Sequence, residues 1–269
     1  MDTIRQKQII INSTILFVIA SIVAMTLHEV GHFFASIIVH ARGISIHHNY
    51  TANDNDGLSL QNLLFIKGAG PFISIAIALL FHFICSRQAK RNNLFLFNLY
   101  MAAFGYIGFF GYVMIAPLFT GGDTGYICYA LGFPIWLTII VAFAGGVGLY
   151  LIISSLTKYF LEMGSKEIIE NKEARIQFIH SLLLYPIFIG IIITTLMNLP
   201  TRAFLSLIAP LCSPFSLFWA YGNALKKNYL SDKFNKEFES FNKPNFWLFF
   251  WFVITIIVNR LLVIGIYVN

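Results

Sequence analysis

The chain has 269 residues, of which 58% are hydrophobic and only 11% are charged, and its mean hydropathy is +0.74. This balance excludes an ordinary soluble domain and indicates a multi-pass integral membrane protein, with the lipid bilayer as a partner. The formal net charge is +6, but the basic residues lie almost wholly between apolar segments, where they determine topology. We therefore expect no nucleic-acid partner.

Seven apolar stretches are long enough to cross a bilayer, for which a helix needs about 20 residues. They cover residues 9–39, 63–86, 94–117, 133–157, 177–198, 203–224 and 245–267. A turn around Leu199-Pro200-Thr201 separates the fifth stretch from the sixth and predicts a tight helical hairpin. The expected fold class is all-α, a polytopic transmembrane bundle of six to seven helices.

The first stretch contains His28-Glu29-Val30-Gly31-His32, an HExxH pattern. On a helix, this spacing places two imidazoles one turn apart on the same face, close enough to hold one Zn²⁺ ion. The glutamate then lies beside the metal, where it can take a proton from bound water. Ionisable residues inside a membrane are costly, so three in one turn indicate a functional site. A chance pattern, or a polar patch that binds a neighbouring helix, is the alternative.

The segment from about residue 40 to residue 62 differs from the other connections. Alternating apolar residues flank Asp56-Gly57, a turn signal, and this predicts a small β-hairpin-like loop after the first helix. The adjacent His47 and His48 could bind a metal, sense pH or simply be solvated. The sequence leaves these three roles open.

A catalytic zinc site usually needs a third protein ligand and keeps one position open for water. Asp123 is the leading candidate, because it directly follows the third apolar stretch in Thr120-Gly121-Gly122-Asp123. The paired glycines would let the backbone bend and aim a carboxylate inward. An ordinary surface turn is the alternative, since Gly-Gly-Asp is common in loops.

These elements together resemble the site-2 protease-like intramembrane zinc metallopeptidases. That family combines HExxH on one transmembrane helix with an aspartate near a later one, and it often has Ala-Gly-Pro at the start of a helix between them. Ala69-Gly70-Pro71 is similar, and so is the hairpin-like loop before it. Two features depart from the family pattern: Ser74 lies where an asparagine often follows Ala-Gly-Pro, and Gly-Gly-Asp replaces Leu-Asp-Gly.

The resemblance implies a zinc metalloendopeptidase that hydrolyses peptide bonds of membrane-embedded or membrane-associated substrates. One Zn²⁺ ion would be held by His28, His32 and Asp123, and Glu29 would be the catalytic general base. Residues 1–130 would form the metalloprotease-like catalytic core, and residues 131–269 would add transmembrane helices to the same membrane domain. The implied partner is a membrane-anchored protein or peptide substrate; the oligomeric state is not indicated.

Two other classes of function stay open at this point. A zinc-dependent membrane hydrolase of a non-protein substrate would use the same chemistry. A non-enzymatic metal-binding or transport protein should instead show polar residues along several helices or paired broken helices. This chain concentrates its chemistry in the first three stretches, which favours hydrolysis.

The basic residues predict the orientation in the membrane. They concentrate before the first stretch and after the second, fourth and sixth, and these four segments share one side if all seven stretches span. The N-terminus is therefore expected to be cytoplasmic and the C-terminus external, which places HExxH toward the external leaflet. The family's sites typically lie toward the cytoplasm, so either the site faces outward here or one stretch does not cross. Arg260, inside the last stretch, could snorkel to the surface or pair internally.

Overall fold

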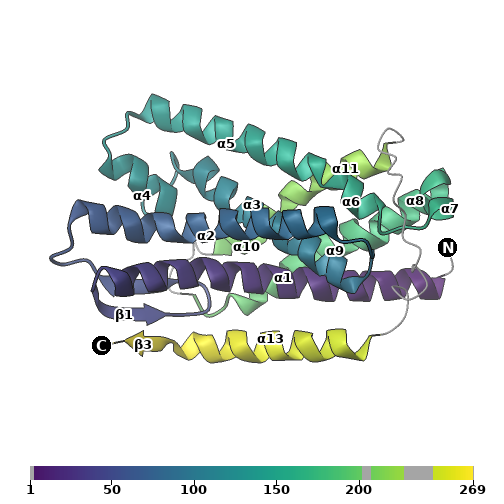
Figure 1. The fold of residues 1–269 in the computed structure, drawn as a ribbon, viewed down its shortest axis with the longest axis horizontal. Helices are drawn as coiled ribbons and strands as arrows, with labels where there is room; N and C mark the ends of the chain where they lie inside the picture. The colour runs from purple at the N-terminus through teal and green to yellow at the C-terminus, as the bar shows by residue number, and fades with distance from the viewer. Residues whose placement is uncertain (1–2, 202–206, 227–244, 269) are drawn as a thin grey trace.

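The computed structural model describes residues 3–201, 207–226 and 245–268. Within these ranges, six helical segments are long and apolar enough to cross a membrane. They are α1 (Thr3–Ile38), α2 (Leu60–Arg87), α3 (Asn93–Ile115), α5 (Ile135–Ser155) continued by α6 (Thr157–Leu161), α8 (Lys172–Ile179) continued through a π turn (His180–Leu184) into α9 (Tyr185–Met197), and α13 (Phe246–Ile264). The expected helix bundle is confirmed (Figure 1).

The predicted stretch 203–224 is not one continuous helix. Its described part consists of α10 (Ile208–Cys212), a 3₁₀ turn (Ser213–Leu217) and α11 (Phe218–Leu225). Pro210 and Pro214 explain the break, because proline lacks the backbone N–H that a continuous helix needs. The segment still returns along the bundle, since α10 packs on α9 whereas α11 reaches α6 and α8.

The expected hairpin is present, but its turn lies elsewhere. Strands β1 (Arg42–Ile46) and β2 (Thr51–Asp54) pair antiparallel, with Ile46 opposite Thr51. The turn is His47–Tyr50, where the His47 N–H donates to the carbonyl of Tyr50 over 2.9 Å. The prediction that Asp56-Gly57 forms the turn of this hairpin was wrong: the chain does turn at these two residues, but they lie in the connection to α2.

A third strand, which the sequence did not predict, completes a small sheet. Strand β3 (Ile266–Val268) follows α13 and pairs antiparallel with β1, giving the order β2-β1-β3. The sheet therefore joins the C-terminal end of the described chain to the loop after α1. The predicted all-α class holds for the bundle, with this sheet as its one addition among the described residues.

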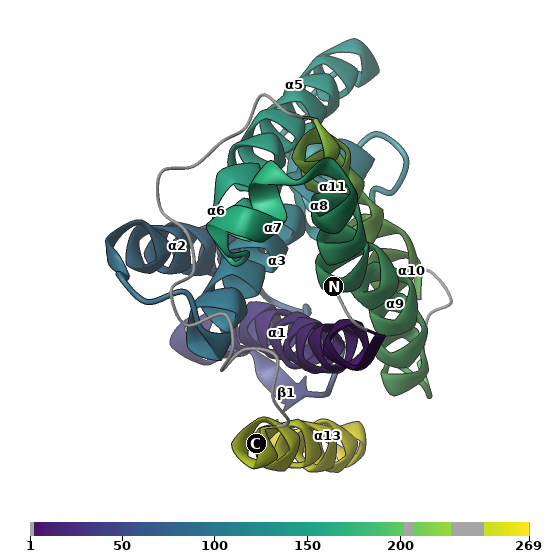
Figure 2. The ribbon, with the colours of Figure 1, turned by 90° about the vertical axis from the view of Figure 1, so that its right-hand side faces the viewer.

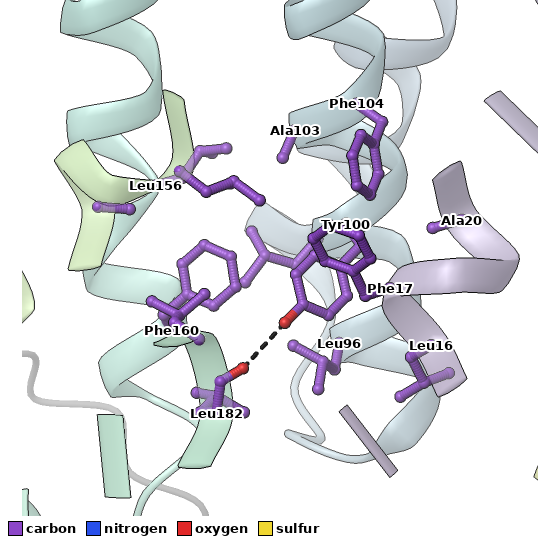
Figure 3. Packing of buried hydrophobic residues seen from close by; sticks show 14 of the residues in the cluster. Leu16, Phe17, Ala20, Leu96, Tyr100, Ala103, Phe104, Leu156, Phe160 and Leu182 are labelled. Atoms are coloured by element: carbon purple, nitrogen blue, oxygen red, sulfur yellow. Dashed lines mark hydrogen bonds between the residues drawn. The ribbon is translucent and has the colours of Figure 1, made fainter. Parts of the chain in front are cut away.

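The bundle is centred on α1, which packs against α2, α3, α9 and α13. Its apolar core includes Phe17 of α1, Tyr100 and Phe104 of α3, and Phe160 of α6 (Figure 3). The buried Tyr100 hydroxyl donates to the carbonyl of Leu182 over 2.9 Å, which satisfies its polar atom inside the apolar cluster. This core lies along the half of α1 that precedes HExxH.

Helix α13 lies on the side of α1 opposite α5 and is the least buried of the six segments (Figure 2). A groove of about 820 Å³ lies between α13, part of α1 and the start of α3, and its walls are mostly apolar. Along α1 the groove reaches Thr26 and Leu27, directly before His28. Arg260 pairs internally: its guanidinium donates to the carbonyls of Met197 and Leu199.

The two ends of the bundle differ in charge. The start of α1, the end of α2, α6, α7 (Lys166–Glu170), α8 and the end of α11 lie at one end (Figure 1). These elements or their immediate neighbours carry Arg5, Lys7, Arg87, Lys90, Arg91, Lys158, Lys166, Lys172, Arg175 and Lys226. The sheet and α4 (Asp123–Ala130) lie at the other end. Arg202, Lys227, Lys233, Lys236 and Lys243 lie outside the described residues.

Candidate metal centre

Three side-chain atoms from separate parts of the chain meet at one point. His28 Nε2 and His32 Nε2 lie 3.1 Å apart, and Asp123 Oδ2 lies 3.1 Å from the first and 3.0 Å from the second. All three residues are 7% exposed or less. Among the described residues, these three side chains form the group whose ligand atoms lie close enough together to hold one metal ion.

The outer nitrogens of both imidazoles are held by α2. His32 Nδ1 lies 2.7 Å from the carbonyl oxygen of Ile66, which can only accept, so Nδ1 carries the proton. In neutral His32 the Nε2 lone pair then points at the carboxylate. His28 Nδ1 lies 2.9 Å from the Ser74 hydroxyl. This is the arrangement that fixes the tautomer of metal-binding histidines.

The donor set fits a divalent cation. In a tetrahedral site with bonds of about 2.0–2.1 Å, neighbouring ligand atoms lie roughly 3.3 Å apart, close to the separations seen here. Lone pairs on His32 Nε2 and on the carboxylate would repel each other at 3.0 Å unless a proton or a cation lies between them. The residues present can therefore bind a metal ion.

Gly70, the central residue of Ala-Gly-Pro, explains how α2 can lie against the two histidines. A Cβ atom built on Gly70 would be 2.2 Å from His32 Nε2 and 2.6 Å from His28 Nε2. Gly31 on α1 has the same effect, since a Cβ atom added there would be 2.8 Å from the carbonyl oxygen of Ala69. The two glycines let the backbones of α1 and α2 approach closely.

Asp123 lies in the first turn of α4. Gly122 is the N-cap of this helix in an extended conformation, so Asp123 is its first helical residue. A carboxylate in the first helical turn is stabilised by the free backbone N–H groups there. Gly125 packs close to the loop, because a Cβ there would lie 2.1 Å from the carbonyl oxygen of Phe119.

Two further side chains contact the site and were not singled out from the sequence. Lys67 Nζ lies 3.7 Å from Asp123 Oδ1, the carboxylate oxygen that does not face the histidines. The Tyr112 ring stacks on the His28 ring, with centroids 4.9 Å apart and planes 10° apart. The sequence signal for Lys67 was a cation inside an apolar helix, three residues before Gly70.

Glu29 lies between the two histidines on α1 and is 7% exposed. The Thr51 hydroxyl of β2 donates to its backbone carbonyl over 2.9 Å, which ties the edge of the sheet to this turn of α1. The structure thus brings together the three side chains that the sequence proposed as metal ligands, and Glu29 follows the first of them on α1. The role of Glu29 as general base remains a prediction.

His47 and His48 do not join this cluster. Both are buried in the turn of the hairpin, which excludes the solvated reading. His48 Nε2 donates to the carbonyl of Asn198 over 3.2 Å, and the His47 ring stacks on Tyr50. Burial, together with the nearby Arg260 and His47, lowers the pKa of His48 below its usual value, although the Asn198 carbonyl acts in the opposite direction.

Comparison of the chain with family models, with curated proteins and with solved structures finds no match in any of the three. The motifs and the geometry of the site are therefore the features from which a function can be inferred.

Proposed function

We propose that this chain is an intramembrane zinc metalloendopeptidase of the site-2 protease type. The observation that carries the proposal is the convergence of His28, His32 and Asp123, whose ligand atoms all lie within 4.8 Å of one another. A metal-storage site would not need a glutamate between the two histidines, whereas hydrolysis needs a base at that position. The order HExxH, Ala-Gly-Pro, Gly-Gly-Asp along the chain adds support.

Zinc is the metal we propose for the site. Two imidazoles and one carboxylate form a common catalytic zinc set, and the fourth position stays open. The same three donors also serve non-haem iron. HExxH with its intervening glutamate favours zinc, because the glutamate provides the base that a hydrolytic zinc site uses.

The chemistry divides between the ion and the chain. When bound, zinc would lower the pKa of a water ligand toward neutrality and polarise the scissile carbonyl. The Glu29 carboxylate would accept the proton of the attacking water and pass it to the leaving amine nitrogen. Ser74 and the Ile66 carbonyl keep both imidazoles oriented during this exchange.

The proposed substrate is a membrane-anchored protein or peptide. A helical substrate hides its carbonyls in hydrogen bonds, so the cleaved segment must be locally extended. Strand β2 is an edge of the sheet, and its residue Thr51 contacts the backbone of Glu29. An extended segment added to this edge would run beside the catalytic turn. The groove between α1 and α13 offers an approach from the bilayer.

The proposed orientation follows from the basic end of the bundle, which we place in the cytoplasm. His28 lies 25 residues after Thr3, about 38 Å along α1 at 1.5 Å per residue. A hydrocarbon layer of about 30 Å that begins near Ile9 would end close to His28. The metal centre would then lie at the external edge of the membrane core.

The proposal is tested by comparing membranes that carry the wild type or Glu29→Gln. New protein N-termini are mapped by mass spectrometry, and zinc per chain is measured on the purified proteins. We expect cleavages within or beside transmembrane segments for the wild type alone, with equal zinc in both. Glu170→Gln, which alters an exposed glutamate on α7, is the matched control and should cleave as the wild type does.

Cleavage by pure Glu29→Gln would overturn the mechanism. If neither protein produces new termini but the wild type alone alters lipids or small peptides, the non-protein hydrolase is favoured. If the two membranes are identical in all respects while zinc is bound, the chain is a non-enzymatic metal-binding protein.

A further inference from the structure

The two oxygens of the Asp123 carboxylate have different partners. Oδ2 faces both imidazole nitrogens, at 3.0 and 3.1 Å. Oδ1 faces the ammonium group of Lys67, with 3.7 Å between Nζ and Oδ1. The Asp123 side chain is 10% exposed and the Lys67 side chain 35% exposed, so the carboxylate is buried and the lysine is only partly buried.

Lys67 belongs to the same face of α2 that supports the histidines. Gly70 and Ser74 follow it by three and seven residues, which places all three side by side on the helix. Ile66, the residue before Lys67, accepts the hydrogen bond from His32. One face of α2 therefore orients both imidazoles and contacts the carboxylate.

The different partners of the two oxygens matter because a carboxylate can bind a metal through one oxygen or through both. A catalytic zinc site needs three protein ligands and one open position. If both oxygens of Asp123 bound the ion, the second would take the place that water needs. An ammonium group beside Oδ1 competes for the lone pairs of that oxygen and leaves only Oδ2 for the metal.

We propose that Lys67 is a positioning residue that restricts Asp123 to single-oxygen ligation and so keeps the fourth metal position open. The inference rests on the metal site of the proposed function and extends it to α2. A lysine in an apolar helix is costly. This cost indicates that Lys67 has a role at the carboxylate it faces.

The test uses Co²⁺ as the probe in the purified full-length chain in detergent. Four-coordinate cobalt absorbs visible light several times more strongly than five-coordinate cobalt, so the spectrum reports the number of ligands. We expect an intense four-coordinate spectrum for the wild type. Lys67→Met should reduce the molar absorbance at least about twofold, because the freed Oδ1 adds a ligand. Lys67→Gln is a second neutral variant, to be used if Lys67→Met does not fold.

Lys67→Arg keeps a cation beside Oδ1 and should restore the spectrum of the wild type. Lys166→Met removes an exposed lysine that pairs with Glu170 on α7, and it should leave the spectrum unchanged. A purely structural role of Lys67 would alter the yield of folded protein but not the absorbance per bound cobalt. The absorbance per bound cobalt therefore distinguishes a positioning role of Lys67 from a role in folding.

Each outcome has one meaning. A neutral variant with the spectrum of the wild type, or a Lys67→Arg variant with the weakened spectrum, would overturn the positioning role. If the wild type itself binds no cobalt, the metal site of the proposed function fails, and this result is distinct from failure of the Lys67 inference. If the neutral variants alone have the weakened spectrum, the role stands.

Discussion

At the scale of single residues, the candidate metal centre depends on the absence of a side chain at position 70. Replacing Gly70 with Ala would put a carbon atom 2.2 Å from His32 Nε2, at the point where the two imidazoles meet. We expect Gly70→Ala to reduce metal affinity at least about a hundredfold. Mutation of a residue that only hydrogen-bonds a ligand typically lowers metal affinity 10–100-fold, and displacement of a ligand itself should lower it further. Isothermal titration calorimetry with Zn²⁺ measures the affinity of both proteins.

Gly68→Ala is the matched control for the Gly70 substitution. It lies two residues earlier on α2, and the nearest atom to its added carbon would be 4.0 Å away. Gly68→Ala should bind zinc as the wild type does. Equal affinity in all three proteins would show that the close approach of α2 is not required for the site.

Several site residues could be predicted from the sequence and several could not. His28, Glu29 and His32 follow from spacing on one helix, and Asp123 from its position after an apolar stretch. Ser74 and Lys67 could not be assigned roles, because their contacts depend on how α2 packs against α1 and α4. HExxH fixes two ligands locally, whereas the outer hydrogen bonds come from residues 34 to 46 positions away.

At the scale of elements, the hairpin turn connects the sheet to α9 and α13. His48 donates to the carbonyl of Asn198, and its backbone N–H donates to the carbonyl of Leu262 over 3.2 Å. Because the pKa of His48 is lowered in the folded state, the undocked turn takes up a proton first as the pH falls. Docking is therefore most stable above the ordinary histidine pKa of about 6.5 and weakens below it.

We expect amide hydrogen exchange of residues 44–52 to become faster between pH 7 and pH 5, after correction for the intrinsic exchange rate. The largest slope that one proton allows is about 1.4 kcal/mol per pH unit. His48→Gln keeps an N–H donor but does not titrate, so its corrected exchange should not depend on pH in this range. The same pH dependence in both proteins would exclude His48 as the cause.

The tertiary position of the turn explains why sequence reasoning placed it wrongly. Asp56-Gly57 is a strong local turn signal, and Gly57 does adopt a positive φ of 80°. Docking of His47–Tyr50 on α9 and α13 nevertheless fixes the hairpin register. The third strand escaped prediction for the same reason, since β3 has only three residues and pairs with a segment more than 200 residues earlier.

At the scale of the whole molecule, α4, which carries Asp123, lies at the end of the bundle opposite the one where most of the described basic residues gather (Figure 1). The proposed orientation gives a direct labelling prediction. With Cys212 replaced by Ser, a cysteine at Asp56 in the loop near the metal centre should react with a membrane-impermeant maleimide in intact cells. A cysteine at Glu167 on α7 should react only after the cells are opened. The reverse pattern would place the site toward the cytoplasm.

The overall bundle was largely predictable, because apolar stretches of membrane length dictate helices almost regardless of detail. The broken segment 207–225 was the exception, and its two prolines carried the signal that hydropathy alone does not. Which helices pack against one another was not predictable, and the close contact of Gly105 on α3 with α2 is an example. A Cβ at Gly105 would lie 2.7 Å from the carbonyl oxygen of Ser74.

The most direct test of the central claim is the zinc content of the purified chain, measured for the wild type beside Asp123→Ala. We expect one zinc ion per wild-type chain and loss of most of that zinc from the variant under the same mild chelation. A wild type that holds no zinc after reconstitution, or a variant that keeps as much as the wild type, would contradict a metal centre built from His28, His32 and Asp123.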